Sequence, residues 1–179
     1  MQATVWFTGL SGAGKTTVAD TLHEVLEERG IDSVRLDGDD LREGLCVDLG
    51  FSQEDRDENI RRVGEVAILF SRTGRLTLVT VISPFAEGRR QVRARHARAG
   101  IPFVEVYVAT PLQVCEERDP KGLYARARRG ELATFTGVSA PYEPPAAPEL
   151  FLDTVGQSPA ESAGRVFALL DSLELLDKG

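Results

Sequence analysis

The sequence contains few cysteines, few lysines and no long apolar run. Two of the 179 residues are cysteine, Cys46 and Cys115, and they lie far apart and outside any metal-ligand spacing. We therefore expect both thiols to be reduced in a cytoplasmic protein without a cysteine metal site. Apolar runs such as LTLVTVI are too short to cross a bilayer, and no secretory signal pattern follows Met1. These absences predict a protein with no membrane partner.

Positive charge is also scarce, which limits the partners that the chain can bind. The formal net charge is -7 and the isoelectric point is near 5.0. A sequence-independent nucleic-acid binder usually carries a basic face, so we expect no nucleic-acid partner. An anionic ligand would have to be held by local cations. Lysine is rare among the 21 basic residues, and two of the lysines, Lys15 and Lys121, fall inside motifs.

Stretches typical of strands alternate along the chain with stretches typical of helices. Periodicity predicts strands at 4–10, 33–37, 76–83, 103–108 and 149–154, and helices at 15–29, 57–74, 87–100, 111–119 and 159–176. The strand at 76–83 is apolar on both faces, as in a parallel sheet that is covered by helices. The pattern predicts one α/β domain over residues 1–179, a doubly wound, mainly parallel sheet with helices on both faces.

The segment from Pro120 to Pro148 lacks clear periodicity and is rich in glycine, proline and arginine. It is too long for an ordinary connection, and such long exceptions are usually lids or disordered stretches. We interpret it as a lid over roughly residues 119–148. Ligands of doubly wound folds bind at the carboxyl ends of the strands, and a lid would close there.

The stretch GLSGAGKT, from Gly9 to Thr16, matches the phosphate-binding pattern G-x-x-x-x-G-K-[ST]. It stands after a predicted strand and before a predicted helix. Its glycines allow backbone N–H groups to surround a phosphate, and the helix directs the positive end of its dipole at the same charge. Lys15 would reach the β- and γ-phosphates, and the Thr16 hydroxyl would bind Mg²⁺. The motif predicts a P-loop kinase fold that binds a nucleoside triphosphate, but it does not identify the phosphate acceptor.

Three acids, Asp37, Asp39 and Asp40, follow the second predicted strand at the ligand-binding edge. Asp37 or Asp39 could lie near the γ-phosphate, hold metal-bound water or accept a proton from an attacking hydroxyl. Asp39 or Asp40 could instead cap the following helix; we assign the cap to Asp40 and the functional role to Asp39. The strand at 76–83 ends in Ser-Pro, without the acid that many P-loop proteins use for magnesium. We therefore assign Mg²⁺ to Thr16 and Asp37.

Arginines near the phosphate loop suit a second anionic substrate. The basic and polar side chains considered for it are Arg42, Arg56, Asn59, Arg61 and Arg62.

Both histidines, His23 and His96, are predicted to lie on helix surfaces, and no role is assigned to them.

Several blocks of sequence together resemble the adenylylsulfate kinase family, from Trp6 to about Asp153. These blocks are GLSGAGKTT, DGDDLREGL, DLGFSQEDRDENIRRVGEVA, VISPF, CEERDPKGLYARAR and FTGVSAPYEPP, in that order. Members of this family use ATP to phosphorylate adenosine 5′-phosphosulfate (APS) at its 3′-hydroxyl. The resemblance implies ATP and Mg²⁺ as cofactors, APS as the small-molecule substrate and a homodimeric assembly.

The resemblance also implies roles for individual residues. ATP would be bound by Gly9, Leu10, Ser11, Gly12, Ala13, Gly14, Lys15, Thr16 and Thr17, with Arg118 beside the adenine. APS would be bound by Asp39, Arg42, Phe51, Arg56, Asn59, Ile82, Ser83, Lys121 and Phe135. The implied catalytic residues are Lys15, Asp39 and Ser83, and the serine is described in the family as a phosphoserine intermediate. Direct in-line transfer needs no such covalent step. Phe51 could instead be a core residue, Phe135 could be a lid residue that packs on the domain, and Ser83 could cap a turn.

Two positions depart from the family pattern, which usually has asparagine where this chain has Asp40 and Cys46. An extra negative charge at Asp40 would weaken the binding of an anionic substrate if the side chain faced the pocket. Two other functions stay open from the sequence. One is a different small-molecule P-loop kinase that acts on a nucleoside or a sugar, and the other is a non-catalytic nucleotide-binding regulatory module.

Overall fold

The computed structural model describes residues 2–176 and contains one parallel β-sheet. The strands are β1 (Ala3–Thr8), β2 (Ser33–Asp37), β3 (Leu76–Thr80), β4 (Phe103–Val108) and β5 (Leu150–Leu152). Their order in the sheet is β2-β3-β1-β4-β5, and every neighbouring pair runs parallel. β1 and β3 are buried along their whole length, as strands covered on both faces must be.

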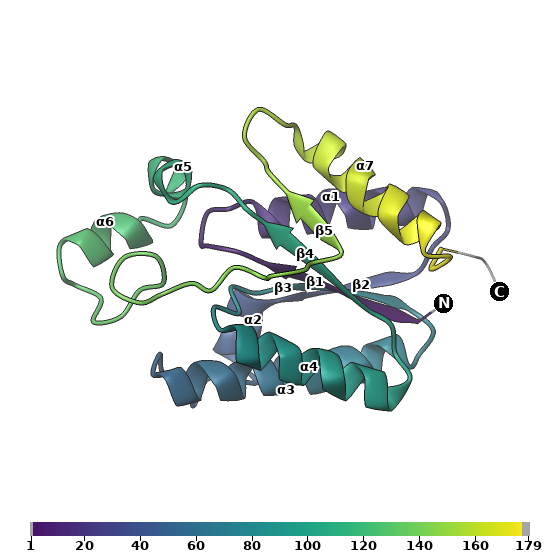
Figure 1. Ribbon diagram of the computed structural model, residues 1–179, viewed down its shortest axis with the longest axis horizontal. Coiled ribbons are helices and arrows are strands. Elements are labelled where there is room, and N and C mark those ends of the chain that lie inside the picture. Colours follow the sequence, from purple (N-terminus) through teal and green to yellow (C-terminus); the bar gives the residue numbers. More distant parts are fainter. Residues whose placement is uncertain (1, 177–179) are drawn as a thin grey trace.

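Helices cover both faces of this sheet. They are α1 (Lys15–Glu28), α2 (Gly38–Glu43), α3 (Gln53–Ser71), α4 (Ala86–Ala99), α5 (Leu112–Arg118), α6 (Leu123–Arg128) and α7 (Pro159–Ser172). Figure 1 shows α1 and α7 on one face and α3 and α4 on the other, with α5 and α6 beyond the carboxyl ends of the strands. The predicted doubly wound α/β fold is confirmed. Within residues 2–176, no helix is long and apolar enough to cross a bilayer.

The alternation of side chains along β1 divides the core into two layers. Val5 and Phe7 pack with the apolar side chains of α1 and α7, while Trp6 packs with those of α3 and α4. Successive residues of a strand point to opposite faces, so a fully apolar strand supplies both layers at once. Because β1 is packed on both faces, its carboxyl end, where the glycine-rich loop begins, is held in a fixed position.

Several predicted element boundaries are wrong, each for a local reason. α3 begins at Gln53 rather than at 57, because the Ser52 hydroxyl accepts a hydrogen bond from the Asp55 N–H at 3.1 Å and caps an earlier, polar turn. α7 ends at Ser172 rather than at 176. Glu174 has a φ of 56°, and this turn brings Leu176 back into the core. α6 lies inside the segment that showed no periodicity, because a helix of six residues is too short to display any.

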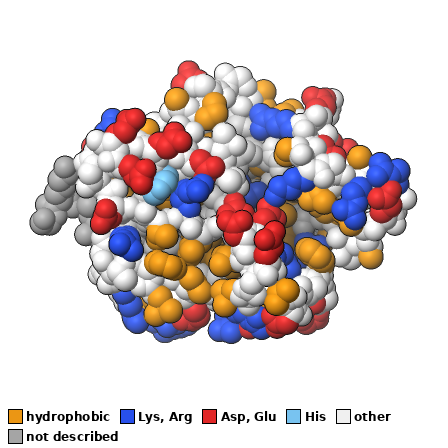
Figure 2. All heavy atoms as spheres, turned by 180° about the vertical axis from the view of Figure 1, so that it is seen from behind, with side chains coloured by type: hydrophobic (Ala, Val, Ile, Leu, Met, Phe, Trp, Pro, Cys, Tyr) orange, Lys and Arg blue, Asp and Glu red, His pale blue; other side chains and the backbone are white. Residues whose placement is uncertain are grey.

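Basic and acidic side chains are interspersed on the surface of the molecule. On the face drawn in Figure 2 they alternate without forming a broad basic area. Many arginines are paired with carboxylates, such as Arg95 with Glu65 at 2.8 Å. An anionic ligand therefore has to be held by a few cations at short range, as the net charge predicts.

His96 is buried, and its predicted place on a helix surface is wrong. Its exposed fraction is 0%. Nδ1 lies 2.8 Å from the Val92 carbonyl oxygen and Nε2 lies 3.0 Å from the Thr4 hydroxyl. Because a carbonyl can only accept, Nδ1 carries the proton and Nε2 accepts from Thr4 in the neutral ring. Because the residues around His96 are rich in arginine, the sequence did not indicate that this side of α4 faces the core.

We expect the free energy of unfolding to fall as the pH drops from about 7.5 towards about 5.5. Burial lowers the pKa of native His96 below the ordinary value of 6.5. The unfolded chain therefore binds the proton first, and stability is lost as the pH falls through that ordinary value. The variant His96→Gln retains hydrogen-bonding groups but does not titrate. Urea unfolding should show a weaker pH dependence for this variant, and an equally steep one would contradict the burial of neutral His96.

Candidate active site

The loop between β1 and α1 has the shape that its glycines make possible. Gly9, Gly12 and Gly14 have φ values of 148°, 73° and 103°, which residues with a side chain rarely adopt. A Cβ atom at Gly9 would lie 2.4 Å from the carbonyl oxygen of Val108, so no larger residue fits there. α1 begins at Lys15 and directs its N-terminus at the loop. This is the geometry that binds phosphate.

Lys15 lies against the loop with only 9% of its surface exposed. Its Nζ donates hydrogen bonds to the carbonyl oxygens of Gly9 at 3.0 Å and Leu10 at 2.7 Å. Burial lowers the pKa of Lys15 to about 8, so the ammonium form predominates at neutral pH. A compact cation is thus held where the motif predicts the β- and γ-phosphates.

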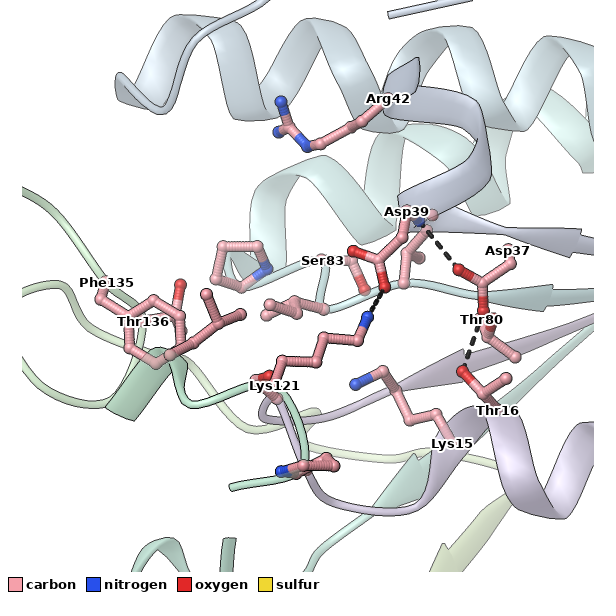
Figure 3. A pocket seen from close by; sticks show the side chains of 18 of the residues that line it. Lys15, Thr16, Asp37, Asp39, Arg42, Thr80, Ser83, Lys121, Phe135 and Thr136 are labelled. Carbon is pink, nitrogen blue, oxygen red and sulfur yellow. Dashed lines mark hydrogen bonds and ion pairs between the residues drawn. The ribbon is translucent and has the colours of Figure 1, made fainter. Parts of the chain in front are cut away.

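Asp37, the last residue of β2, is the most extensively hydrogen-bonded acid of the site. One carboxylate oxygen accepts from the hydroxyls of Thr16 at 2.9 Å and Thr80 at 2.7 Å. The other accepts from the Asp39 backbone N–H at 2.9 Å. Burial opposes ionisation, but these hydrogen bonds outweigh it and hold the pKa of Asp37 below its ordinary value. Figure 3 shows the resulting junction of β2, β3 and α1.

The helix cap predicted at Asp40 is wrong, because Asp37 caps α2 through its bond to the Asp39 N–H. The three acids are equally suited to a cap by composition, and only the register of the turn decides among them. Thr80 is a residue that sequence reasoning missed. A single threonine at the end of a buried strand gives no signal of its role.

Asp39 stands in the first turn of α2 and forms an ion pair with Lys121. Lys121 lies between α5 and α6, so the pair joins the acidic turn to the segment predicted to be a lid. Both side chains are exposed to solvent. In Figure 3 the amines of Lys15 and Lys121 point into the same part of the cavity. Two cations and one acid therefore meet beside the phosphate loop.

A second group of side chains lies across the cavity, where Figure 3 places Arg42 opposite Lys15. The guanidinium of Arg42 lies 4.5 Å from the centre of the Phe51 ring, and that of Arg56 lies 5.9 Å from it. Phe51 is 58% exposed, so the alternative that it is a core residue is wrong. Asn59 is 6% exposed, and its Oδ1 has no hydrogen-bond partner within residues 2–176. An aromatic ring, two cations and a buried amide thus face one space.

Ile82 and Ser83 form a wall of this space after the end of β3. Ser83 is 2% exposed and has a φ of 40°. Its hydroxyl accepts a hydrogen bond from Trp6 Nε1 at 3.1 Å and donates one to Thr8 Oγ1 at 2.8 Å. The hydroxyl is therefore engaged on both sides within the protein.

The segment of residues 119–148 returns to the site through Phe135. This ring is 9% exposed and packs edge-to-face on Tyr124, with 5.0 Å between the ring centres. Arg118, just before the segment, donates to the Thr154 hydroxyl at 3.1 Å and to the Ala13 carbonyl at 3.3 Å. Its guanidinium is thereby fixed beside the phosphate loop.

A cavity of about 1400 Å³ connects these groups. Most of the predicted site residues line it, namely Ser11, Gly12, Gly14, Lys15, Thr16, Thr17, Asp37, Asp39, Arg42, Phe51, Arg56, Asn59, Ile82, Ser83, Arg118, Lys121 and Phe135. The structure does not place Gly9, Leu10 or Ala13 among the lining residues. It adds Thr80, Thr154 and Gln157, which the sequence did not single out.

Two arginines considered for an anionic substrate do not line the cavity. Arg61 pairs with Glu58 at 2.6 Å, and Arg62 pairs with Asp48 at 2.6 Å. They belong to a charged helix face, and their predicted role at the site is wrong.

The two departures from the family pattern fall in different environments. Asp40 is exposed and lines the cavity, whereas Cys46 is 1% exposed and does not line it. The change at position 46 is therefore a matter of packing, and the change at position 40 adds a carboxylate to the site.

The chain matches known proteins along most of its length. A family model described as adenylylsulphate kinase matches residues 1–153. The adenylyl-sulfate kinase of Shewanella oneidensis is 54% identical over 173 residues, which are 97% of this chain and 82% of that protein. Among solved structures, the Mycobacterium tuberculosis APS kinase CysC in complex with AMPPNP and APS has a TM-score of 0.93 and 54% identity. That match covers 95% of this chain and 98% of the other.

A sugar kinase from Janibacter matches with a TM-score of 0.67 and 21% identity, covering 100% of both chains, and this likeness shows the fold alone. The much higher identity to adenylyl-sulfate kinases, together with the family match over residues 1–153, goes further. The chain belongs to the adenylylsulfate kinase family.

Proposed function

We propose that the chain performs the reaction of its family by direct in-line transfer. The γ-phosphoryl group of ATP passes to the 3′-hydroxyl of APS and yields 3′-phosphoadenylyl sulfate and ADP. The observation that carries this proposal is the cavity itself. It joins the phosphate loop to the side chains of Phe51, Arg42 and Arg56, and the Asp39–Lys121 ion pair lies between the two groups.

The ATP half of the cavity is lined by residues of the phosphate loop and the start of α1, namely Ser11, Gly12, Gly14, Lys15, Thr16 and Thr17, and by Arg118. The loop's backbone N–H groups and the α1 dipole would hold the phosphates, and Lys15 would neutralise charge on the β- and γ-phosphates. The Arg118 guanidinium, fixed by Thr154 and Ala13, would flank the adenine. The Lys15 amine donates to the carbonyl oxygens of Gly9 and Leu10, so it would have to turn from these carbonyls to the phosphates when the nucleotide binds.

Thr16 and Asp37 fit a magnesium ion by the chemistry of their donors. Mg²⁺ prefers hard oxygen ligands and usually takes few from the protein. The Thr16 hydroxyl and the Asp37 carboxylate are oxygen donors that lie 2.9 Å apart. The lowered pKa of Asp37 keeps it ionised. A bound Mg²⁺ would offset the charge of the β- and γ-phosphates during transfer.

The APS half would use Phe51, Arg42, Arg56 and Asn59. The exposed Phe51 ring would stack on the adenine of APS, and the two arginines would bind its anionic groups. The free Oδ1 of Asn59 offers a buried acceptor to the substrate. Ile82 and Ser83 would wall this subsite, and Phe135 would close over the adenine.

Asp39 would accept the proton of the attacking 3′-hydroxyl. Its ion pair with Lys121 orients the carboxylate towards the cavity, and Lys121 would then contact the transferred phosphoryl group. Ser83 is assigned a positioning role in this scheme. Its hydroxyl is buried and engaged by Trp6 and Thr8, and in-line transfer needs no phosphoserine.

The segment of residues 119–148 would act as the lid of this single domain. Lys121 and Phe135 from the segment line the same cavity as the phosphate loop. Closure would exclude water, which otherwise competes with the acceptor hydroxyl.

The expected homodimer and the cytoplasmic location stay predictions. The chain mass is 19.5 kDa, and sedimentation at twice this mass would bear out the dimer.

Other acceptors and a non-catalytic role are disfavoured by specific observations. A sugar kinase and a gluconokinase share only 21% and 18% identity with this chain. A regulatory module would not need Lys15, Thr16, Asp39 and Lys121 together around one cavity. The deciding measurement is ADP release from Mg-ATP with APS present and then absent, together with a screen of nucleoside and sugar acceptors.

Replacing Asp39 by asparagine should lower turnover by about 10²-fold or more, because a general base contributes that much. ATP affinity should stay within about twofold, since the phosphate loop is untouched. Steady-state kinetics with APS and a nucleotide titration check the two values. Asp40→Asn is the matched control, because the ion pair with Lys121 is made by Asp39. Its turnover at saturating APS should stay within about threefold, while its KM for APS should fall because a carboxylate that lines the cavity is removed. Near-normal turnover of Asp39→Asn would remove Asp39 from the mechanism.

Replacing Phe51 by alanine should raise the KM for APS by about fivefold or more, since base stacking on an aromatic ring contributes about 1–3 kcal/mol. The KM for ATP should change little. Phe151→Ala serves as the control, because that ring is equally exposed at 57% but does not line the cavity. A parallel rise of both KM values in Phe51→Ala would show that the ring supports the fold and not APS alone.

A further inference from the structure

Arg89, in the first turn of α4, is a buried cation that no part of the proposed mechanism uses. Only 4% of it is exposed. Its Nη1 donates to the Ser83 carbonyl oxygen at 2.5 Å, and its Nη2 donates to the Glu143 carbonyl oxygen at 2.6 Å. Its Nε forms an ion pair with Glu105 at 2.9 Å. Burying a charge is costly unless all its donors are satisfied, so this arrangement calls for a role.

The first carbonyl is that of Ser83. Ser83 and Ile82 line the cavity on the side where APS would bind, and we call these two residues the Ser83 wall. Ser83 has a φ of 40°, a conformation that residues with a side chain adopt only where their surroundings enforce it. Trp6 and Thr8 fix its hydroxyl, and Arg89 fixes its carbonyl. Arg89 itself does not line the cavity. Arg89 can therefore act on the cavity only indirectly, through the residues that it holds in place.

The second carbonyl belongs to residues 141–144, which we call the return segment because they follow Phe135 back to the sheet. Glu143 donates its N–H to the Pro84 carbonyl at 2.8 Å, and its carboxylate accepts from the Ala86 N–H at 2.7 Å. The Tyr142 hydroxyl lies 2.9 Å from Thr8 Oγ1. The return segment is thus hydrogen-bonded directly to Pro84 and Ala86, which follow Ser83 in the chain, and to Thr8, which accepts a hydrogen bond from the Ser83 hydroxyl.

Glu105 leaves both terminal nitrogens of Arg89 available for these carbonyls. It lies on β4 and is 7% exposed, and it forms an ion pair with Nε although its Oε1 has no hydrogen-bond partner within residues 2–176. Arg93, one turn further along α4, also pairs with Glu105 at 3.3 Å and with Glu149 at 2.7 Å. Arg93 therefore shares the ion pair of Arg89 but touches neither Ser83 nor Glu143. It is a natural control.

We propose that Arg89 is a positioning residue for the acceptor substrate. Its planar guanidinium holds the Ser83 wall and the return segment in one fixed relation, so that the APS half of the cavity is formed before APS binds. A lysine has a single ammonium and does not span two carbonyls in this way. The inference rests on the proposed function, and the measurements below separate the two.

The test compares Arg89→Lys with Arg93→Gln in the whole chain. For Arg89→Lys, the KM for APS should rise by about tenfold or more, as the loss of a charged hydrogen bond implies, while ATP affinity stays within about twofold. For Arg93→Gln, both values should stay within about twofold. Should Arg89→Lys lose its cooperative thermal transition, the double variant Arg89→Met/Glu105→Gln replaces it, because it leaves no buried carboxylate unpaired.

Tryptophan emission gives a second readout that does not depend on turnover. Trp6 is the one tryptophan of the chain, and its indole N–H donates to the Ser83 hydroxyl. The emission of folded Arg89→Lys should differ from that of the wild type, because the Ser83 wall has moved. The emission of Arg93→Gln should change less, because Arg93 reaches the indole only through Phe103, whose ring lies 4.9 Å from the guanidinium and 5.7 Å from Trp6.

The outcomes distinguish the two proposals. A wild-type protein without APS-dependent ADP release would overturn the proposed function. Normal wild-type turnover with an unchanged KM for APS in the Arg89 variants would overturn the positioning role alone. An equal loss of ATP and APS affinity would also overturn it, because a general structural role predicts that result.

Discussion

One carboxylate, that of Asp37, holds the active-site edge of the sheet together. It receives hydrogen bonds from the first turn of α1, from the end of β3 and from the first turn of α2. The first turn of α1 after the phosphate loop, the end of β3 and the acidic turn are thereby held together. Because the carboxylate stays ionised, the same group that has this structural role also fits the proposed binding of Mg²⁺. The positions of Asp39 and Thr16 both follow from this single group.

The electrostatics of the site are local rather than global. A chain with a net charge of -7 does not attract ATP and APS by its overall field. The proposed binding cations are instead local: Lys15, Lys121 and two arginines all line one cavity. Burial lowers the pKa of Lys15 to about 8, and a bound polyphosphate would raise it again by direct attraction. Bound ATP would therefore stabilise the protonated form of Lys15, which is the form that attracts the phosphates.

The sequence predicted those features that depend on local requirements. The glycines of the phosphate loop need positive φ values, and the alternation along β1 needs two covered faces, so both could be recognised without a structure. Thr80, His96 and Arg89 could not. Each has a partner far away along the chain, at a separation of 43, 92 and 54 residues, and nothing in their own neighbourhoods indicates a role. The cap at Asp37 was missed for a different reason, since three adjacent acids are equally suited to it.

The geometry at Ser83 bears on the choice between direct transfer and a phosphoserine. A phosphorylated Ser83 would have to give up the hydrogen bond that it donates to Thr8 and place a dianion beside the buried indole of Trp6. Such a charge is costly in a site that is 2% exposed, unless Arg89 or another cation turned towards it. The guanidinium of Arg89 is already engaged by two carbonyls and Glu105. Asp39, by contrast, is exposed within the cavity and paired with Lys121. The structure therefore favours Asp39 as the group that meets the acceptor hydroxyl and Ser83 as the group that holds the wall behind it.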